Sequence, residues 1–220
     1  MLSREVSQVL YNTVKLIQNG CRRSILILAC VAVLIASAAR AESFFLPYSS
    51  VADELSYTCE SGYEEVFQAV VDCSRHIPEV ILQDFRNEGW QIIVGDDHIN
   101  EYMEQNNRTN VIGLIAYSQK TIWIKDSRAT WHEWGHYLYS RMEDTNEIVD
   151  IFLQDYDKIA GCLGEHYKES DSEYFAECFE LYLRGKLLGV FRNRLQDNFS
   201  NMYGYLIRLE ADGWGMTEQV

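Results

Sequence analysis

The chain has 220 residues, which is enough for one domain or at most two small ones. It is 47% hydrophobic, 13% aromatic and 24% charged and has two prolines, so its composition indicates a folded globular protein and excludes intrinsic disorder. The formal net charge of −14 argues against a nucleic-acid-binding protein, because phosphate contacts require clustered lysine and arginine.

The first forty residues differ from the rest of the chain. An uncharged apolar run, Ile25–Ala39, follows the basic pair Arg22-Arg23. The run has about 15 residues, fewer than the roughly 20 that a transmembrane helix needs, and it ends in the small-x-small sequence Ala-Arg-Ala at 39–41. Residues 1–41 are therefore predicted to be a signal peptide or an uncleaved signal-anchor. In either case the rest of the chain would lie outside the cell, secreted or held on the outer side of the membrane.

Four cysteines follow this leader: Cys59, Cys73, Cys162 and Cys178. Export permits disulfides, and the two local pairings are Cys59–Cys73 and Cys162–Cys178. Cys178 lies within a predicted helix, so a buried, unpaired thiol is the alternative at that position.

The exported part begins with a predicted linker, residues 42–60, before a domain that covers 61–220. Residues 63–86 have a helical pattern that is interrupted at His-Ile-Pro, 76–78. The apolar run 90–94 follows a turn and predicts a short buried strand.

Two β-prone runs come next, Val111–Tyr117 and Thr121–Lys125. The three polar residues between them indicate a β-hairpin. Beyond Asp126 the pattern is helical, so the predicted order is helix, strand, hairpin and then helices, which is an α+β fold with a small mixed sheet. In such a fold an exposed strand edge can receive a peptide substrate, and we expect Val111–Tyr117 to be that edge, with Gly113 permitting close backbone approach.

The helix predicted from about Arg128 to Met142 contains His132-Glu133-Trp134-Gly135-His136. Histidines four residues apart project from the same helix face and can bind one zinc ion together. Glu133 lies beside that face, where its carboxylate can take a proton from zinc-bound water. Gly135 costs roughly 1 kcal/mol of helix stability relative to alanine, which indicates that substrate or a neighbouring strand approaches closely there.

A catalytic zinc site needs a third protein ligand and one open position for water. No His-x-x-Gly-x-x-His extension follows the motif, so a gluzincin-type site with a glutamate on a later helix is expected. A helix beginning near Ser170 carries Glu173, Glu177 and Glu180 in one stripe between apolar faces. Three buried carboxylates without a cation would be unfavourable, so we expect Glu173 to bind the metal.

Other roles remain open for these acids. Ser170 and Glu173 have the spacing of a capping box, in which the Glu173 carboxylate would bind a backbone amide. A stripe of acids can also be the solvated face of a helix. Glu177 is the alternative ligand, but we expect it to lie behind the ligands and to accept the ring N–H of a zinc-bound histidine.

The sequence HEWGH at 132–136 followed by EYFAE at 173–177 resembles the catalytic domain of anthrax lethal factor and its relatives, which include secreted bacterial Pro-Pro endopeptidases. The similarity extends over roughly 63–184. It implies a zincin-like metallopeptidase domain in which His132, His136 and Glu173 hold zinc and Glu133 is the general base.

One position departs from the pattern of that family. Its members have a tyrosine seven residues before the ligand glutamate, and the tyrosine hydroxyl stabilises the tetrahedral intermediate. Here His166 occupies that position and Tyr167 follows it. Both remain candidates, because a shift of one residue in a loop would present Tyr167 and because an imidazole can also donate to an oxyanion.

The predicted function is therefore a secreted or cell-surface zinc endopeptidase with one zinc ion per chain and a peptide or protein substrate. No nucleic-acid partner is expected, and contact with a membrane is expected only through an uncleaved leader. Three alternatives remain: a non-catalytic zinc-containing binding or toxin module, an intracellular HExxH regulatory protease, and a hydrolase of cell-wall peptide crosslinks.

Overall fold

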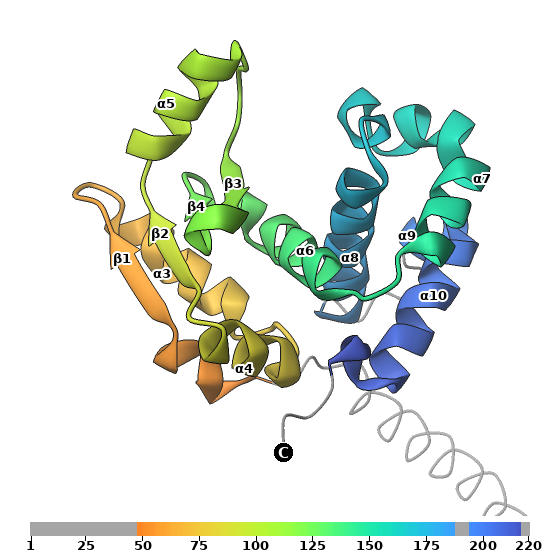
Figure 1. Ribbon diagram of the computed structural model, residues 1–220, viewed down its shortest axis with the longest axis horizontal. Helices are drawn as coiled ribbons and strands as arrows, with labels where there is room; N and C mark the ends of the chain where they lie inside the picture. The colour runs from red at the N-terminus through yellow and green to blue at the C-terminus, as the bar shows by residue number, and fades with distance from the viewer. Residues whose placement is uncertain (1–47, 188–193, 217–220) are drawn as a thin grey trace, which may run out of the picture. The chain divides into compact units, whose positions relative to one another are not determined.

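Four short strands form one mixed sheet in the computed structural model, which describes residues 48–187 and 194–216 (Figure 1). The strands are β1 (Ser56–Cys59), β2 (Gln91–Val94), β3 (Gly113–Ala116) and β4 (Thr121–Ile124), and their order in the sheet is β1-β2-β4-β3. The pairs β1–β2 and β2–β4 are parallel, whereas β3–β4 is the predicted antiparallel hairpin. Strand β3 therefore has one edge free of partners within the sheet.

The predicted linker, 42–60, is wrong over the part that the structure describes. Residues Ser50–Glu54 form a 3₁₀ helix, and all four residues of β1 pair with β2. The strand escaped prediction because it lies at a sheet edge and most of its side chains are exposed, so its sequence lacks an apolar alternation. The leader, 1–41, lies outside the described residues.

Three helices connect the strands: α3 (Glu64–Ser74), α4 (Glu79–Asn87) and α5 (Asp97–Asn106). The break between α3 and α4 falls at the predicted place, with Pro78 as the residue before α4. The β-hairpin turns through a short 3₁₀ segment, Tyr117–Gln119, and Lys120 follows it with a φ of 48° that closes the turn.

The second part of the fold is helical, as predicted. It consists of α6 (Thr130–Arg141), α7 (Asn146–Cys162), α8 (Asp171–Leu187), α9 (Arg194–Asn198) and α10 (Ser200–Ala211). The Asp126 side chain accepts a hydrogen bond from the Arg128 amide and caps a 3₁₀ turn, Ser127–Ala129. Helix α6 therefore begins at Thr130, two residues after the predicted start near Arg128. Within the described residues, none of the helices combines the length and the apolar character needed to span a membrane.

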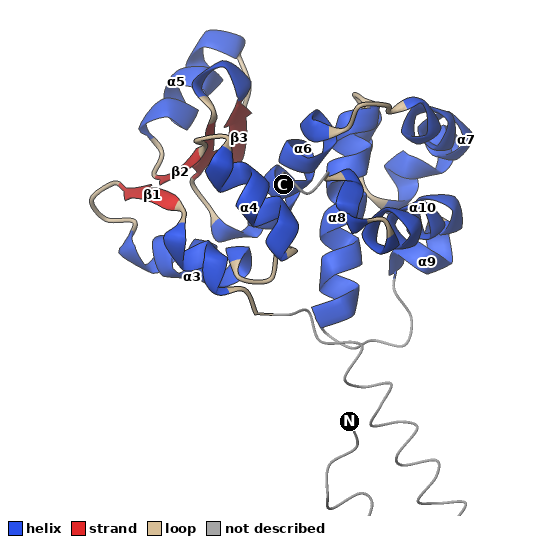
Figure 2. Ribbon diagram, turned by 60° about the horizontal axis from the view of Figure 1, so that its bottom comes forward, coloured by secondary structure: helices blue, strands red, loops and turns tan. Residues whose placement is uncertain are grey.

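Helices α6 and α8 lie side by side, with the sheet and α3–α5 on one side of them and α7, α9 and α10 on the other (Figures 1 and 2). The two helices come into close contact at Gly135, where an added Cβ would lie 2.7 Å from the Cα of Ala176 and 3.0 Å from its carbonyl oxygen. From the sequence we expected substrate or a strand to approach Gly135 closely. In the structure the neighbour is instead the backbone of helix α8. Large aromatic side chains of both helices are fully buried. Trp134 and Tyr137 of α6 pack against Phe85 of α4, and Tyr174 of α8 packs against Phe199.

Replacing Gly135 by alanine should therefore destabilise the fold, although alanine favours helices. A methyl group at 135 crowds the Ala176 backbone, and overpacking of this kind costs about 1–3 kcal/mol. We expect the melting temperature of the metal-free protein to fall by about 3–10 °C, measured by circular dichroism.

Gly161→Ala is the matched control. Gly161 lies in an exposed part of α7, and a methyl group added there would meet nothing within 4 Å, so alanine should leave the melting temperature unchanged or raise it slightly. A Gly135→Ala protein as stable as Gly161→Ala would contradict the close helix contact.

Candidate active site

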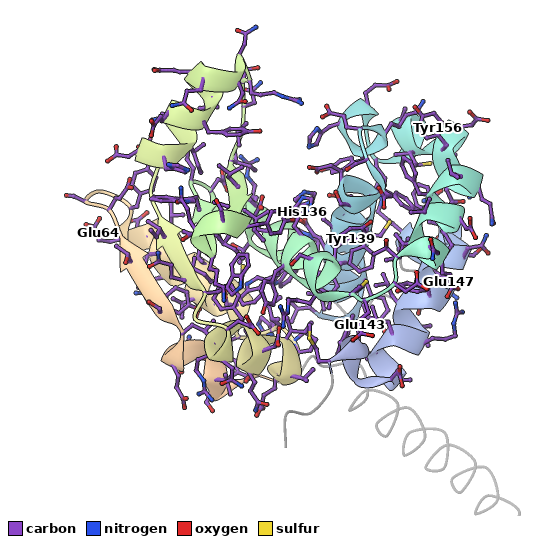
Figure 3. All side chains as sticks on the ribbon, in the orientation of Figure 1. Glu64, His136, Tyr139, Glu143, Glu147 and Tyr156 are labelled. Carbon is purple, nitrogen blue, oxygen red and sulfur yellow. The ribbon has the colours of Figure 1, made fainter. Side chains whose placement is uncertain are left out.

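The contact between α6 and α8 brings the three predicted metal ligands together. The Nε2 atoms of His132 and His136 are 3.1 Å apart. Glu173, in the first turn of α8, places its Oε2 atom 3.2 Å from His132 Nε2 and 3.4 Å from His136 Nε2. Figure 3 shows the His136 side chain between β3 and α8.

This triangle of atoms has the dimensions of a zinc site. Tetrahedral ligands at about 2.0–2.1 Å from zinc lie about 3.3 Å from one another, and the three separations, 3.1–3.4 Å, match that value. Two imidazole nitrogens and one carboxylate oxygen are also a donor set that zinc prefers. The group formed by His132, His136 and Glu173 can therefore bind a metal ion, and its geometry is consistent with zinc.

The capping-box alternative for Glu173 is only half realised. Ser170 does cap α8, since its hydroxyl accepts a hydrogen bond from the Glu173 amide at 3.1 Å. The Glu173 carboxylate, however, lies against the two histidines and not against the cap. The backbone and the side chain of Glu173 thus have separate partners.

Glu177 lies on the other side of His132. Its Oε2 atom is 3.7 Å from His132 Nδ1, an ion-pair distance longer than a hydrogen bond, and that nitrogen is buried without a hydrogen-bond partner. A proton on Nδ1 facing Glu177 leaves the Nε2 lone pair free for a metal. Glu177 thus lies behind the candidate ligands and faces His132 Nδ1 without a hydrogen bond to it.

The charge around His132 favours a bound cation. Burial lowers the pKa of His132, but the carboxylates of Glu173 and Glu177 more than offset that effect and raise the pKa to about 10. At Glu173, burial raises the pKa of the carboxyl, but hydrogen bonds to His132 and His136 and their charges outweigh this effect. They hold the pKa of Glu173 far below its usual range. Either a proton or a metal ion can satisfy such a site, because both bind the same imidazole nitrogen.

Glu133 is buried beside the metal-binding group, with 5% of its surface exposed. Burial raises the pKa of its carboxyl, and the charges of His132 and His136 oppose this shift only in part. A carboxylate with a raised pKa is a better proton acceptor, which suits a general base.

The loop before α8 places both oxyanion candidates at the site. His166 Nε2 lies 3.2 Å from Glu173 Oε2, and its Nδ1 lies 3.1 Å from Glu169 Oε1. The Tyr167 ring centroid is 5.9 Å from that of His132. Burial, followed by the charge of Glu177, raises the pKa of Tyr167 well above its usual range, so its hydroxyl keeps its proton.

A cleft of about 880 Å³ lies over these residues. Strand β3 and the segment before it line one wall, and α8 with the loop before it lines the other. Arg108 spans the two walls by binding both carboxylate oxygens of Glu169, at 3.3 and 3.2 Å. Sequence reasoning missed this pair, because no local pattern links residues so far apart in the chain.

Two further cleft residues were also missed. Partial burial, followed by the charges of Glu133 and Glu173, raises the pKa of Tyr117 to about 12. Arg184, near the end of α8, lies over the Trp131 ring and binds Glu180 at 2.7 Å, which accounts for the third acid of the predicted stripe.

His98 and the four cysteines do not belong to the metal-binding group. The His98 ring stacks on Trp123, with centroids 4.6 Å apart. All four described cysteines are free thiols, so neither local disulfide forms. The reason is placement: Cys178 is buried in the core side of α8, as its unpaired alternative predicted, while Cys162 is exposed at the end of α7.

Comparison with known proteins reveals a relative of this fold. No known protein family matches the chain by sequence, and no curated protein does. Ten chains of solved structures are similar to it. One is the Pro-Pro endopeptidase PPEP-2 from Paenibacillus alvei, which is 18% identical, with a TM-score of 0.52 over 73% of this chain and 100% of that chain.

The fold is similar to that of this Pro-Pro endopeptidase. This likeness confirms the resemblance and the α+β fold class predicted from the sequence. At this identity it establishes the architecture, whereas the metal-binding capacity rests on the three side chains themselves.

Removing one ligand tests the metal site directly. His136→Ala should weaken zinc binding by at least about 100-fold, more than the loss of a residue that only orients a ligand usually costs. The readout is zinc per chain by elemental analysis, together with a competition titration against a chromophoric chelator. His98→Gln is the control and should keep one zinc per chain, since His98 lies outside the triangle. Equal zinc content in the two variants would refute the assignment.

Proposed function

We propose that this chain is a zinc-dependent endopeptidase that hydrolyses peptide bonds in a peptide or protein substrate. The observation that carries the proposal is the triangle formed by His132, His136 and Glu173, with the buried Glu133 beside it, at the base of a cleft. The likeness of the fold to a Pro-Pro endopeptidase supports it. Export through the leader, 1–41, is part of the proposal and rests on the sequence.

The roles of the residues follow from their positions. His132, His136 and Glu173 would hold zinc, which when bound lowers the pKa of water and polarises a carbonyl group. Glu133 accepts the proton of the attacking water and passes it to the leaving amine. Glu177 faces His132 Nδ1 and keeps the ring in the orientation and tautomer that metal binding needs.

The free edge of β3 is the proposed binding site for the substrate backbone. Ile112 accepts a hydrogen bond from Lys125 across the hairpin at 2.9 Å, and the register pairs Gly113 with Ile124. Because pairing alternates along an antiparallel ladder, the N–H and C=O groups of Gly113 and Ile115 point away from β4. An extended peptide in the cleft can pair with these groups as an added strand.

Glu133→Gln should abolish turnover and leave zinc bound, because glutamine keeps the size of the side chain but cannot accept the proton. We expect loss of at least 1,000-fold in kcat, in line with removal of a general base on the order of 10²–10⁴. The substrate is a diverse peptide library incubated with residues 42–220, and mass spectrometry detects the fragments.

A chelator-treated sample and a zinc-reloaded sample serve as controls. Cleavage by the wild type that the chelator stops and zinc restores supports the proposal. A wild-type protein with one bound zinc and no cleavage of any peptide would favour the alternative of a binding module. Retained activity in Glu133→Gln would eliminate Glu133 as the base.

The two oxyanion candidates can be separated in the same assay. Both nitrogens of His166 already face carboxylates, whereas the Tyr167 hydroxyl faces the Glu177 carboxylate with its single proton, which it keeps beside the metal ligands. We therefore expect Tyr167→Phe to lower kcat by about 100- to 1,000-fold with zinc retained, and His166→Gln to lower kcat less. The reverse order would assign the oxyanion to His166.

A further inference from the structure

Gly113 is the first residue of β3 and lies directly against the first turn of α6. A Cβ atom at this position would be 2.5 Å from Glu133 Oε1, 2.9 Å from Glu133 Cγ and 2.7 Å from the Ala129 Cβ. Contacts below 3.0 Å are not tolerated by real Cβ atoms, so the space that a side chain at 113 would fill belongs to Glu133 and Ala129.

Backbone conformation does not explain the glycine. Gly113 is not among the described glycines with positive φ, and it pairs regularly with Ile124 in the hairpin. Any residue can adopt that conformation, and glycine within a strand weakens it. The requirement at 113 is therefore for space, and the atoms that take the space are mainly those of the carboxylate arm of Glu133.

The same residue turns its backbone to the open edge of the sheet. Its N–H and C=O groups point away from β4, toward the cleft, while its missing side chain leaves room for Glu133 beneath. We propose that Gly113 is a positioning residue: it holds the Glu133 carboxylate directly under the strand edge. This inference rests on the proposed function of Glu133 as the base.

A double-mutant cycle on stability tests the contact without metal or activity. Four metal-free proteins are compared: the wild type, Gly113→Ala, Glu133→Ala and the double variant. Because Glu133→Ala removes two of the three crowded atoms, Gly113→Ala should lower the melting temperature by about 3 °C or more in the wild-type background and by less than half as much in Glu133→Ala.

Gly135→Ala supplies the matched control for this cycle. Its methyl group crowds Ala176 and not Glu133, so its effect on the melting temperature should be equal in both backgrounds. Equal effects of Gly113→Ala in the two backgrounds would overturn the proposal. If Gly113→Ala does not fold but the double variant does, the contact between Gly113 and Glu133 is supported. If neither variant folds, the proposal is overturned.

Kinetics then test the consequence for catalysis. A methyl group at 113 leaves the strand's backbone groups in place but displaces the base, so Gly113→Ala should lower kcat at least 10-fold and change KM less than 3-fold, with zinc retained. Gly161→Ala should keep wild-type kcat. An unchanged kcat in Gly113→Ala would overturn the proposal, as would a loss confined to KM. If Glu133→Gln remains active, the proposed function fails, but the stability cycle still reports whether Gly113 and Glu133 are coupled.

Discussion

The close contact between α6 and α8 is the constraint on which the site depends. The two backbones meet at Gly135 and Ala176, and the helices run antiparallel, since Tyr139 donates a hydrogen bond to Asp171 at one end and Arg184 covers Trp131 at the other. This register puts the face that carries the two histidines opposite the first turn of α8, where the ligand glutamate lies. A larger residue at the crossing would separate groups that must lie within about 3.3 Å of one another to share one tetrahedral ion.

The same contact concentrates negative charge at the site. It gathers carboxylates at positions 133, 173, 177 and 180 around two imidazoles. Glu180 also pairs with Arg184, and Glu173 also pairs with His166. Buried carboxylates are unfavourable unless a cation compensates them. When no metal ion is bound, a proton on His132 supplies that charge, which is why its pKa is raised to about 10. A divalent cation compensates the same carboxylates with twice the charge. Because it binds the imidazole nitrogen that would otherwise carry the proton, metal binding and loss of this proton are linked.

The sequence predicted the features of the site that depend on residues close together within one helix. Histidines at i and i+4 share a helix face in any helix, so the pair at 132 and 136 needed no tertiary information. Glu173 followed because an apolar helix with an acidic stripe requires a cation. Strand β1 was missed because only its backbone pairing, and not its side chains, marks it as part of the sheet. The ion pair between Arg108 and Glu169 was missed for a similar reason, since it depends on where two distant loops meet.

At the two glycines beside the motif, the sequence correctly predicted a close approach but assigned it to the wrong neighbour. Gly135 and Gly113 each indicated close approach, which the sequence assigned to substrate or a strand at the first position and to substrate at the second. In the structure a helix backbone fills the space at Gly135, and the carboxylate arm of Glu133 fills the space at Gly113. Helix α6 is thus in close contact with α8 on one side and with β3 on the other. The contact with α8 brings the two histidines to Glu173, and the contact with β3 places Glu133 under the strand edge. Because both contacts require glycine, Gly135 and Gly113 together determine the distances among the metal ligands, the base and the substrate strand.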